Sequence, residues 1–482
     1  MSRQIIIIGG GISGLAVLHY LQKRFGSRPD VHLRLLEQNS RVGGAIQSQP
    51  ENGCLFEAGP NGFGDSKPTT LELVEELGLK DRLIVANPRS RLRYISLRNQ
   101  LQVIPLNPVE LLRFQPLSFR DKLRIFAEMF IPKGRNPDET VFEFGRRRFG
   151  ENFVKYFFDP MVSGIFAGDA QDLNLKSAFP RIYELEQKYG SLIKGMLSMK
   201  RNSPLPNPPY EGEGKMGGDN EKFSPPLVGG VRGGGKGAGL GGQLCSFQNG
   251  MSELVQGIFE RYRGCVQLDE EVRSIVPQGN GFAIDTARIK YFADELFLCV
   301  TAYGAARLAE SWAPALAGLL AKIAYVPIAV IGLVYRRSDF SKVPEGFGYL
   351  IPSSEGKEAL GVIFASNIFA GRAEEGNVLL QIMMGGAHHH EVAEKNTPEL
   401  FALAEAEIRQ TFQVSAEPIQ RFEKILPRAI PQYNREYSGL RKRLDEERGR
   451  YPHLHLAANY LDGIAVNDCI QNAKIIVEKI SI

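Results

Sequence analysis

The chain has 482 residues, of which 43% are hydrophobic and 23% charged, a composition typical of a globular protein with two or three domains and a large core. A net charge of +4 and an isoelectric point near 8.6 are only mildly basic, so nucleic acid is not expected as a partner. The five cysteines are scattered and show no C-x-x-C or zinc spacing, which favours free thiols in a reducing compartment over a disulfide framework.

The N-terminal stretch "IIIIGGGISGLAVLHYL" is typical of dinucleotide binding. The apolar run 5–8 predicts a buried parallel strand, and the leucine repeat over 15–21 predicts a helix directly after it. Between them, Gly9 allows a tight turn, Gly11 lets a pyrophosphate approach the backbone, and Gly14 lets helix and strand pack closely. The helix N-terminus adds free N–H groups and positive dipole charge. An ordinary glycine turn is the alternative, and the apolar run is too short for a signal peptide.

The next strand makes the nucleotide prediction more specific. "VHLRLLEQ" ends near Glu37, about twenty residues beyond the glycine turn, where an acid binds ribose hydroxyls and repels the 2′-phosphate of NADP. Glu37, Arg41, Gly43 and Gly44 then resemble the E-x-x-x-R-x-G-G pattern of the flavin-binding amine oxidase superfamily. We expect this second glycine turn to pass beside the diphosphate, with Arg41 as a counter-charge. The pattern favours FAD over NAD.

The middle of the chain contains two insertions. Residues 108–200 predict a helical block, and the segment 106–132 around its start mixes apolar residues with Arg113, Arg120, Lys122 and Arg124. That segment is either an interfacial surface that contacts a membrane or an amphipathic helix with one face in the core. In residues 203–242, roughly half the positions are Gly or Pro, so we expect a disordered inserted loop.

After this loop the pattern indicates a return to the nucleotide domain. "CVQLDEEVRSIV", "GFAIDTA" and "ELFLCV" predict strands, the last of which leads into a helix, and the C-terminal "HLHLAANYLDGIAVNDCIQNAKIIVEKI" repeats strand, glycine turn and helix. The apolar window from Leu316 is interrupted by Lys322 and Pro327, which predicts a helix end followed by a core strand and not a membrane span. Strand-like runs follow over 325–430. The expected fold class is α/β (α+β overall), with a discontinuous FAD-binding domain over 1–88, 243–305 and 450–482, and a β-rich substrate domain over 89–107 and 306–449.

Several segments resemble, in order, the oxygen-dependent protoporphyrinogen IX / coproporphyrinogen III oxidases of haem biosynthesis. They include "FEAGPNGF" from Phe56, "RRRFGENFVKYFFDPMVSGIFAGDA" from Arg146, "GGQLCSFQNGM", "YVPIAVIGLVY", "EGFGYLIPS", "AIPQYN" and "NYLDGIAVNDCI". The resemblance covers almost the whole chain except the 203–242 insertion. The C-terminal turn departs from the family's pattern at two positions. Ala458 adds a methyl group close to the flavin, and Asp462 is expected to add a negative charge beside the pocket.

The resemblance implies a Rossmann-like domain that binds FAD non-covalently. It implies a six-electron oxidation of a porphyrinogen by three rounds of hydride transfer to flavin N5, with O₂ as acceptor and H₂O₂ as product. No catalytic side chain is assigned. The glycine motifs and the resemblance together give the expected FAD contacts: Gly9, Gly10, Gly11, Ile12, Ser13, Gly14, Glu37, Gln38, Arg41, Gly43, Gly44, Gly59, Pro60, Asn61, Gly62, Val272, Asn459, Gly463, Ile464, Ala465 and Val466.

The resemblance also implies a substrate site that needs an apolar slot for the macrocycle and cations for its propionates. Arg93 matches a propionate-binding arginine, with a solvated arginine on an edge strand as the alternative. Leu350, Ile363 and Met383 match apolar positions against the tetrapyrrole, with plain core packing as the alternative, and Gly164 matches a pocket glycine. The three adjacent histidines from His388 would point in different directions, so no metal is expected.

The expected partners are a porphyrinogen and O₂. Peripheral membrane contact, a handover to a ferrochelatase and a homodimer are further expectations, and the expected location is the cytoplasm or the cytoplasmic face of a membrane. The sequence leaves open whether protoporphyrinogen IX or coproporphyrinogen III is the substrate. The alternative functions are an amine oxidase, a carotenoid desaturase, or an escort-type module of the same fold that has lost its flavin.

Overall fold

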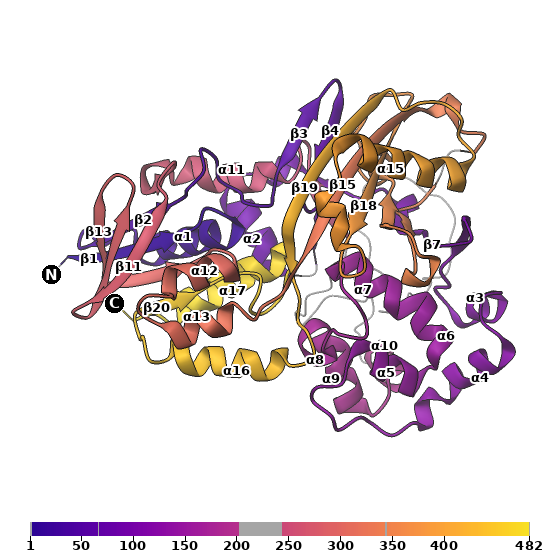
Figure 1. The fold of residues 1–482 in the computed structure, drawn as a ribbon, viewed down its shortest axis with the longest axis horizontal. Coiled ribbons are helices and arrows are strands. Elements are labelled where there is room, and N and C mark those ends of the chain that lie inside the picture. Colours follow the sequence, from indigo (N-terminus) through magenta and orange to yellow (C-terminus); the bar gives the residue numbers. More distant parts are fainter. Residues whose placement is uncertain (1, 66, 202–242, 343–344, 482) are drawn as a thin grey trace.

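The computed structural model describes residues 2–65, 67–201, 243–342 and 345–481. The insertion expected to be disordered lies outside these residues. The described chain forms two halves (Figure 1). One half carries the N-terminal strand and the C-terminal helix, and the other places a large sheet next to a block of short helices. Within the described residues, every helix is too short or too polar to cross a bilayer.

A parallel sheet of five strands forms the centre of the first half. Its order is β10 (Val266–Gln267), β2 (Val31–Leu36), β1 (Arg3–Ile8), β14 (Glu295–Leu298) and β20 (Leu454–Leu456). Ile8 pairs with Leu36 on one side and with Leu298 on the other. Strands from the beginning, middle and end of the chain therefore meet in one sheet, in agreement with the repeated strand–turn–helix pattern.

The alternation of side chains along the strands divides the core between the two faces of this sheet. Ile5 and Ile7 pack with helices α1 (Ile12–Phe25) and α17 (Val466–Glu478), whereas Ile6 and Ile8 face the antiparallel strands β11–β13. These three strands are β11 (Val272–Gln278), β12 (Gly281–Thr286) and β13 (Lys290–Ala293). The prediction of one strand through "CVQLDEEVRSIV" is wrong, because the chain turns at Asp269, where φ is +53°, and β10 and β11 belong to different sheets.

Further helices surround this half: α2 (Pro68–Glu76), α11 (Ser252–Arg261), α12 (Ala302–Ala309), α13 (Pro314–Leu320) and α16 (Tyr437–Arg448). Helix α13 followed by β15 (Tyr325–Arg336) matches the prediction for the apolar window. Helices α13 and α16 pack against each other beside β20 in the first half (Figure 1), although both lie within the range 306–449 assigned to the substrate domain.

The second half is built on a seven-stranded sheet. Its order is β19 (Gln420–Pro431), β15, β18 (Asn377–Gly385), β17 (Ala359–Ile363), β16 (Gly348–Leu350), β7 (Arg93–Leu97) and β8 (Gln100–Val103). Alternate residues, such as Tyr349, Val362 and Ile382, are buried against helix α15 (Thr397–Phe412). The other face is turned towards the helical block, where helix α7 (Asp159–Phe166) packs on β16 and β17.

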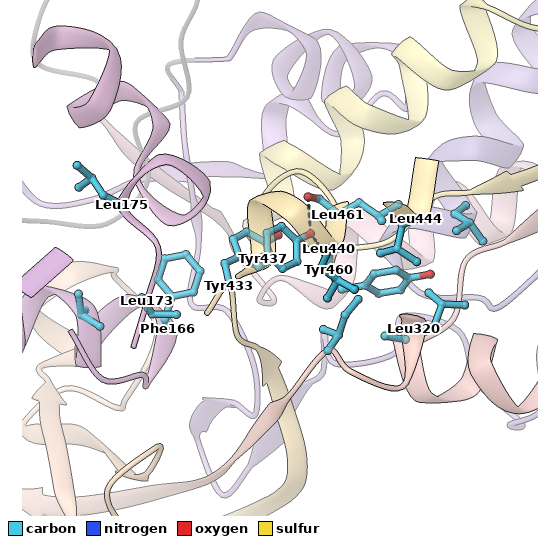
Figure 2. Close-up of a cluster of buried hydrophobic side chains, with 14 of the residues drawn as sticks. Phe166, Leu173, Leu175, Leu320, Tyr433, Tyr437, Leu440, Leu444, Tyr460 and Leu461 are labelled. Atoms are coloured by element: carbon cyan, nitrogen blue, oxygen red, sulfur yellow. Dashed lines mark hydrogen bonds between the residues drawn. The ribbon is translucent and has the colours of Figure 1, made fainter. Parts of the chain in front are cut away.

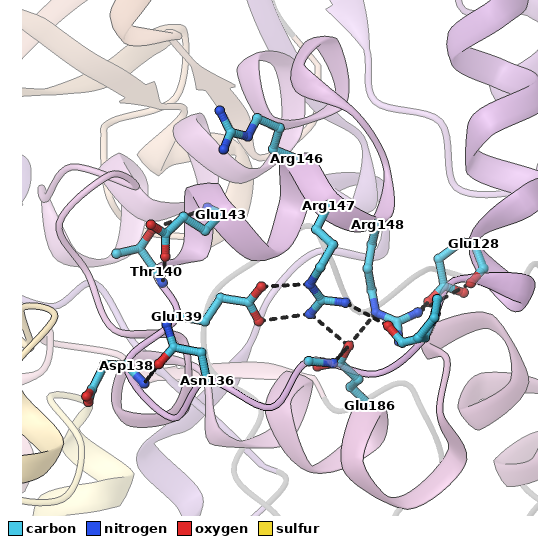
Figure 3. Close-up of polar contacts among 12 residues, drawn as sticks. Glu128, Asn136, Asp138, Glu139, Thr140, Glu143, Arg146, Arg147, Arg148 and Glu186 are labelled. Carbon is cyan, nitrogen blue, oxygen red and sulfur yellow. Dashed lines mark hydrogen bonds and ion pairs between the residues drawn. The ribbon is translucent and has the colours of Figure 1, made fainter.

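Residues 108–201 form the helical block, as predicted. Its helices are α3 (Pro108–Arg113), α4 (Phe119–Ala127), α5 (Val141–Arg148), α6 (Glu151–Phe153), α7, α8 (Leu175–Ala178), α9 (Pro180–Tyr189) and α10 (Leu192–Arg201). Figure 3 shows the ion-pair network inside this block. Arg148 is fully buried and contacts Glu128 and Glu186, while its neighbour Arg147 binds Glu139 through two hydrogen bonds of 2.7 and 2.8 Å. The network joins segments that are far apart in the sequence.

Candidate active site

The first glycine turn ends at the N-terminus of α1. Gly9 has a φ of +105°, and a Cβ atom on Gly14 would lie 1.9 Å from the carbonyl oxygen of Gly9, so both positions require glycine. Gly11 is the N-cap of α1 and provides no side-chain cap, and a Cβ atom there would meet nothing within 4 Å. The turn therefore leaves open space in front of the first N–H groups of the helix, as a bound diphosphate requires.

The second glycine turn lies against the first. The amide of Gly43 donates to the carbonyl of Gly10 over 2.8 Å, and a Cβ atom on Gly44 would lie 3.4 Å from the Cα of Gly11. Arg41 is exposed, and its guanidinium donates to the carbonyls of Val42 and Gly44 over 3.2 and 3.0 Å. Arg41 thus braces the second turn, and its role as a counter-charge stays a prediction.

Glu37 is held at the edge of the two turns. Its carboxylate is only 6% exposed, and one oxygen accepts from the amide of Gly10 over 2.6 Å. The other oxygen accepts from the backbone and side chain of Asn39 over 2.9 and 2.6 Å. Gln38, the next residue, is exposed. The amide of Glu270 donates to the carbonyl of Glu37, and Val272, two residues after Glu270, is buried at the start of β11. These hydrogen bonds fix the carboxylate of Glu37 in one position, which suits a group that hydrogen-bonds the ribose hydroxyls of a nucleotide.

The predicted residues Gly59, Pro60, Asn61 and Gly62 lead from a contact with the second glycine turn to residues 63–64, which contact α17. A Cβ atom on Gly59 would meet the carbonyl oxygen of Ala45 at 2.1 Å. A residue that sequence reasoning missed joins this loop to α17: Asn467 donates from its side chain to the carbonyl of Gly64 over 2.7 Å. Asn467 is fully buried and its Oδ1 atom has no protein partner within the described residues. The only feature of the sequence that could have indicated Asn467 is its position just after the C-terminal glycine turn.

The C-terminal turn leads into α17 through Asn459, Gly463, Ile464, Ala465 and Val466. The amide of Ala465 is capped by Asp468, which also contacts Lys67 over 2.5 Å. The side chain of Asp462 is exposed, and Arg441 donates to its carboxylate over 3.0 Å, so the expectation that Asp462 adds a charge beside the pocket stays a prediction.

Helices α1 and α17 place their N-termini side by side. The two helices pack against each other, and the side chain of Ser13, close to Ile12 at the start of α1, contacts the thiol of Cys469. Burial raises the pKa of Cys469 to about 11, so its thiol stays protonated and is a poor nucleophile for a covalent flavin link. The open space at Gly11, the uncapped N-terminus of α1 and the unpaired acceptor on Asn467 fit FAD. The residues that would hold it are those of the two glycine turns, the loop 59–62 and the C-terminal turn.

The predicted substrate residues share one face of the seven-stranded sheet. Leu350 pairs with Gly361, which pairs with Met383, and Ile363 follows two positions after Gly361 on the same face. These three apolar side chains are partly exposed, in contrast to their buried neighbours on the α15 face. Gly164 on α7 is exposed and lies against this face, since a Cβ atom there would meet Leu350 at 2.6 Å.

Arg93 lies at the edge of the same face. In the parallel pairing of β7 and β16, Arg93 lies opposite Gly348, which in turn lies opposite Ile363. The guanidinium is partly buried and stacks 4.4 Å from the ring centre of Phe347. The sheet therefore places one cation beside a row of half-exposed apolar side chains, an arrangement suited to a planar apolar ligand that carries a carboxylate.

Comparisons with known proteins identify the family and the fold. The family described as flavin containing amine oxidoreductase matches residues 12–481. The chain is 30% identical to protoporphyrinogen oxidase 1, chloroplastic, of Spinacia oleracea, over 97% of this chain and 82% of that protein. It is 25% identical to coproporphyrinogen III oxidase of Bacillus subtilis, over 98% of this chain and 96% of that protein. The crystal structure of a putative protoporphyrinogen oxidase from Exiguobacterium superposes with a TM-score of 0.79 at 21% identity, over 99% of this chain and 98% of that chain.

The two glycine turns and the family match together define the class: the chain belongs to the flavin containing amine oxidoreductase family. It is an FAD-dependent oxidoreductase, and it resembles the porphyrinogen oxidases within that class along nearly its whole length.

Proposed function

We propose that the chain oxidises a porphyrinogen, either protoporphyrinogen IX or coproporphyrinogen III, to the corresponding porphyrin with O₂ as acceptor. Three two-electron steps would remove six hydrogens from the macrocycle and reduce three O₂ to three H₂O₂. The observation that supports this most is the row of half-exposed apolar side chains with Arg93 at its edge. The names of the relatives support the same substrate class and differ on its member.

In this proposal the protein residues bind and orient the substrate. FAD, when bound, supplies the two-electron acceptor. Leu350, Ile363 and Met383 would cover one face of the macrocycle and exclude water, and Arg93 would fix its rotation by binding one propionate through two parallel hydrogen bonds. Because aromatisation provides driving force, the proposal needs no side-chain base.

Turnover of both porphyrinogens by the flavin-replete protein tests the proposal. We expect red porphyrin fluorescence to appear well above the rate of autoxidation, with three O₂ consumed per porphyrin formed. Comparison of kcat/KM for the two substrates decides between them. H₂O₂ production from an amine, or desaturation of a carotenoid, without porphyrin formation would favour the alternative enzymes. A colourless protein that cannot be loaded with FAD would favour the escort-type module.

We also propose that the helical block contacts an anionic membrane. Helix α4 begins with a Ser118–Asp121 capping box and buries only Ile125, while Phe119 is 72% exposed and Phe130, three residues past its end, is 82% exposed. The set of exposed apolar residues on α3, α4 and the turn after it is Val109, Leu112, Phe119, Leu123, Phe126 and Phe130. Cationic side chains lie among them, which suits an anionic bilayer surface.

Flotation with vesicles that contain phosphatidylserine tests the membrane proposal. We expect the protein to float at low salt, and the double variant Phe119→Ser, Phe130→Ser to stay at the bottom of the gradient. A matched control is Val276→Ser, because Val276 is also exposed but lies on β11 in the other half. If the wild-type protein does not float, the membrane proposal is wrong, and the porphyrinogen proposal is unaffected.

A further inference from the structure

Tyr433 is a buried tyrosine whose hydroxyl binds the C-terminal turn that precedes α17. Its hydroxyl donates to the carbonyl of Asn459 over 2.6 Å and accepts from the amide of Gly463 over 2.9 Å. Both residues are predicted FAD contacts. Tyr433 is 1% exposed, and burial raises the pKa of its phenol well above the usual value, so the hydroxyl remains a donor across the working pH range.

A second tyrosine supports the same turn. The ring of Tyr437 stacks on that of Tyr433 with centres 4.4 Å apart, and its hydroxyl reaches the carbonyls of Tyr460 and Leu461, the latter over 2.8 Å. Tyr437 is the first residue of α16, and Figure 2 shows the two rings between Phe166 of the helical block and Tyr460. Two hydroxyls thus bind four backbone groups within residues 459–463.

The segment that carries Tyr433 is fixed on its other side by the helical block. The carbonyl of Tyr433 accepts from the amide of Asn174 over 2.8 Å, and the side chain of the preceding Gln432 donates to the carbonyl of Phe166 over 2.8 Å. Phe166 also packs against the Tyr433 ring, with centres 5.7 Å apart. Because Phe166 ends the helix that carries Gly164, the substrate face and the C-terminal turn share one rigid link.

We propose that Tyr433 is a positioning residue whose hydroxyl holds residues 459–463 in the conformation that contacts FAD, with Tyr437 supporting the same turn. The inference rests on the proposed function only in that this turn must touch the flavin, and it does not depend on which substrate is oxidised. Without the hydroxyl, the amide of Gly463 loses its acceptor and the carbonyl of Asn459 loses its donor. The turn would then be free to move while the ring packing stays intact.

The test compares Tyr433→Phe with Tyr335→Phe in the full-length holoenzyme. Tyr335 is an equally buried tyrosine on β15, on the α15 side of the sheet, so its substitution controls for the loss of a buried hydroxyl. We expect Tyr433→Phe to release FAD about tenfold faster, measured by the rise of free-flavin fluorescence. We also expect it to change the visible flavin spectrum and to speed amide hydrogen exchange in residues 459–465. Tyr335→Phe should leave all three unchanged.

Wild-type FAD release and exchange in Tyr433→Phe would overturn the inference. Faster exchange spread evenly over the whole chain would also overturn it, because that result indicates general destabilisation. If Tyr433→Phe does not fold, Tyr437→Phe decides, since its hydroxyl binds the same turn: we expect faster FAD release there too, and wild-type release would reject the proposal. A wild-type protein that binds FAD but forms no porphyrin would reject the proposed substrate and leave this test valid.

Discussion

Gly11 and Gly14 lie three residues apart in the same turn, yet a side chain has different consequences at each. A Cβ atom on Gly11 meets no protein atom within 4 Å, whereas one on Gly14 lies 1.9 Å from a backbone oxygen. We therefore expect Gly11→Val to fold but to lose FAD, because the side chain occupies the space of the diphosphate. Gly14→Val should fail to fold properly. Flavin absorbance after purification, together with thermal unfolding, separates the two effects, and a yellow Gly11→Val protein would contradict this role.

Arg93 is the cation that the sheet places at the edge of the apolar face. Replacement by Ala should leave FAD bound and remove one anchor of the macrocycle. Loss of a charged hydrogen-bonded pair costs about 2 kcal/mol, so kcat/KM should fall roughly thirtyfold. Arg93→Lys should recover only part of the loss, because an ammonium group cannot reproduce the planar fork.

Steady-state porphyrin fluorescence measures this effect. The matched control is Arg336→Ala, an exposed arginine at the end of β15, which should keep wild-type kinetics. Unchanged kcat/KM of Arg93→Ala with both porphyrinogens would remove Arg93 from the substrate site. The next candidates would then be Arg89, Arg91 and Arg98, which precede and follow it in the chain.

Glu57 gives the protein a pH-dependent stability. Its carboxyl accepts from Ser48 over 2.7 Å and from the amide of Met251 over 2.8 Å, and Arg372 is 3.8 Å away. Burial nevertheless raises the pKa of Glu57 to about 7, from 4.5 in the unfolded chain. Between these two values the folded state binds the extra proton, so the stability due to Glu57 is fully present below pH 4.5 and is lost as the pH rises through 7.

We expect the difference in unfolding free energy between wild type and Glu57→Gln to change by about 2.5 kcal/mol between pH 8 and pH 5, in favour of wild type at the lower pH. Denaturant titrations at both pH values, with FAD at the same saturation, measure it. The variant is its own control for the other titrating groups, because they are common to both proteins. A difference that does not vary with pH would show that Glu57 titrates normally.

At the scale of elements, the three consecutive arginines at the end of α5 behave differently because the helix turns about 100° per residue. Arg148 points into the block and contacts Glu128 and Glu186, which are also fully buried, while Arg146 is exposed. Arg148→Met should cost about 3–5 kcal/mol, because the buried Glu128 loses its ion-pair partner and Glu186 keeps only Arg147. Arg146→Met on the same helix should cost less than about 1 kcal/mol.

Circular dichroism during denaturant unfolding measures both values. Equal midpoints for the two variants would mean that water reaches the buried carboxylates, and the network would then contribute little to the stability of the helical block.

The N-termini of other helices are stabilised by local contacts. Capping boxes at Thr140–Glu143 and Asn396–Glu399 start α5 and α15 from residues only three apart.

At the scale of the whole molecule, the local parts of the fold were predictable from the sequence and the long-range parts were not. The run 5–8, the glycine motif and Glu37 determine a strand, a turn and a helix within forty residues, and the structure agrees. The strand expected through "CVQLDEEVRSIV" divides because a single residue, Asp269, takes a left-handed conformation that local alternation does not reveal. Likewise, nothing in "RRRFG" indicates which arginine is buried.

The residues of the candidate substrate site were predicted mainly from the resemblance to porphyrinogen oxidases and less from local sequence patterns. Arg93 and Leu350 share a sheet face only because β7 pairs with β16, more than 250 residues later in the chain, and no local signal predicts that pairing. Tyr433 was part of the quoted "AIPQYN" segment but received no role, because its partners at 459 and 463 are defined by the folded turn. Asn467 was missed for the same reason.

The order of strands in the parallel sheet has a consequence for synthesis. Strand β1 must wait for β14 and then for β20 and α17, which lie close to the other end of the chain. At typical translation speeds of about 5–20 residues per second, roughly 20–90 seconds separate the first strand from the last. Until β14 is made, one edge of β1 has no partner strand. Until the C-terminal turn and α17 are made, the nascent chain has no complete site for FAD. Such a protein should acquire its flavin only after α17 has been synthesised, and it would benefit from a chaperone that shields the early strands.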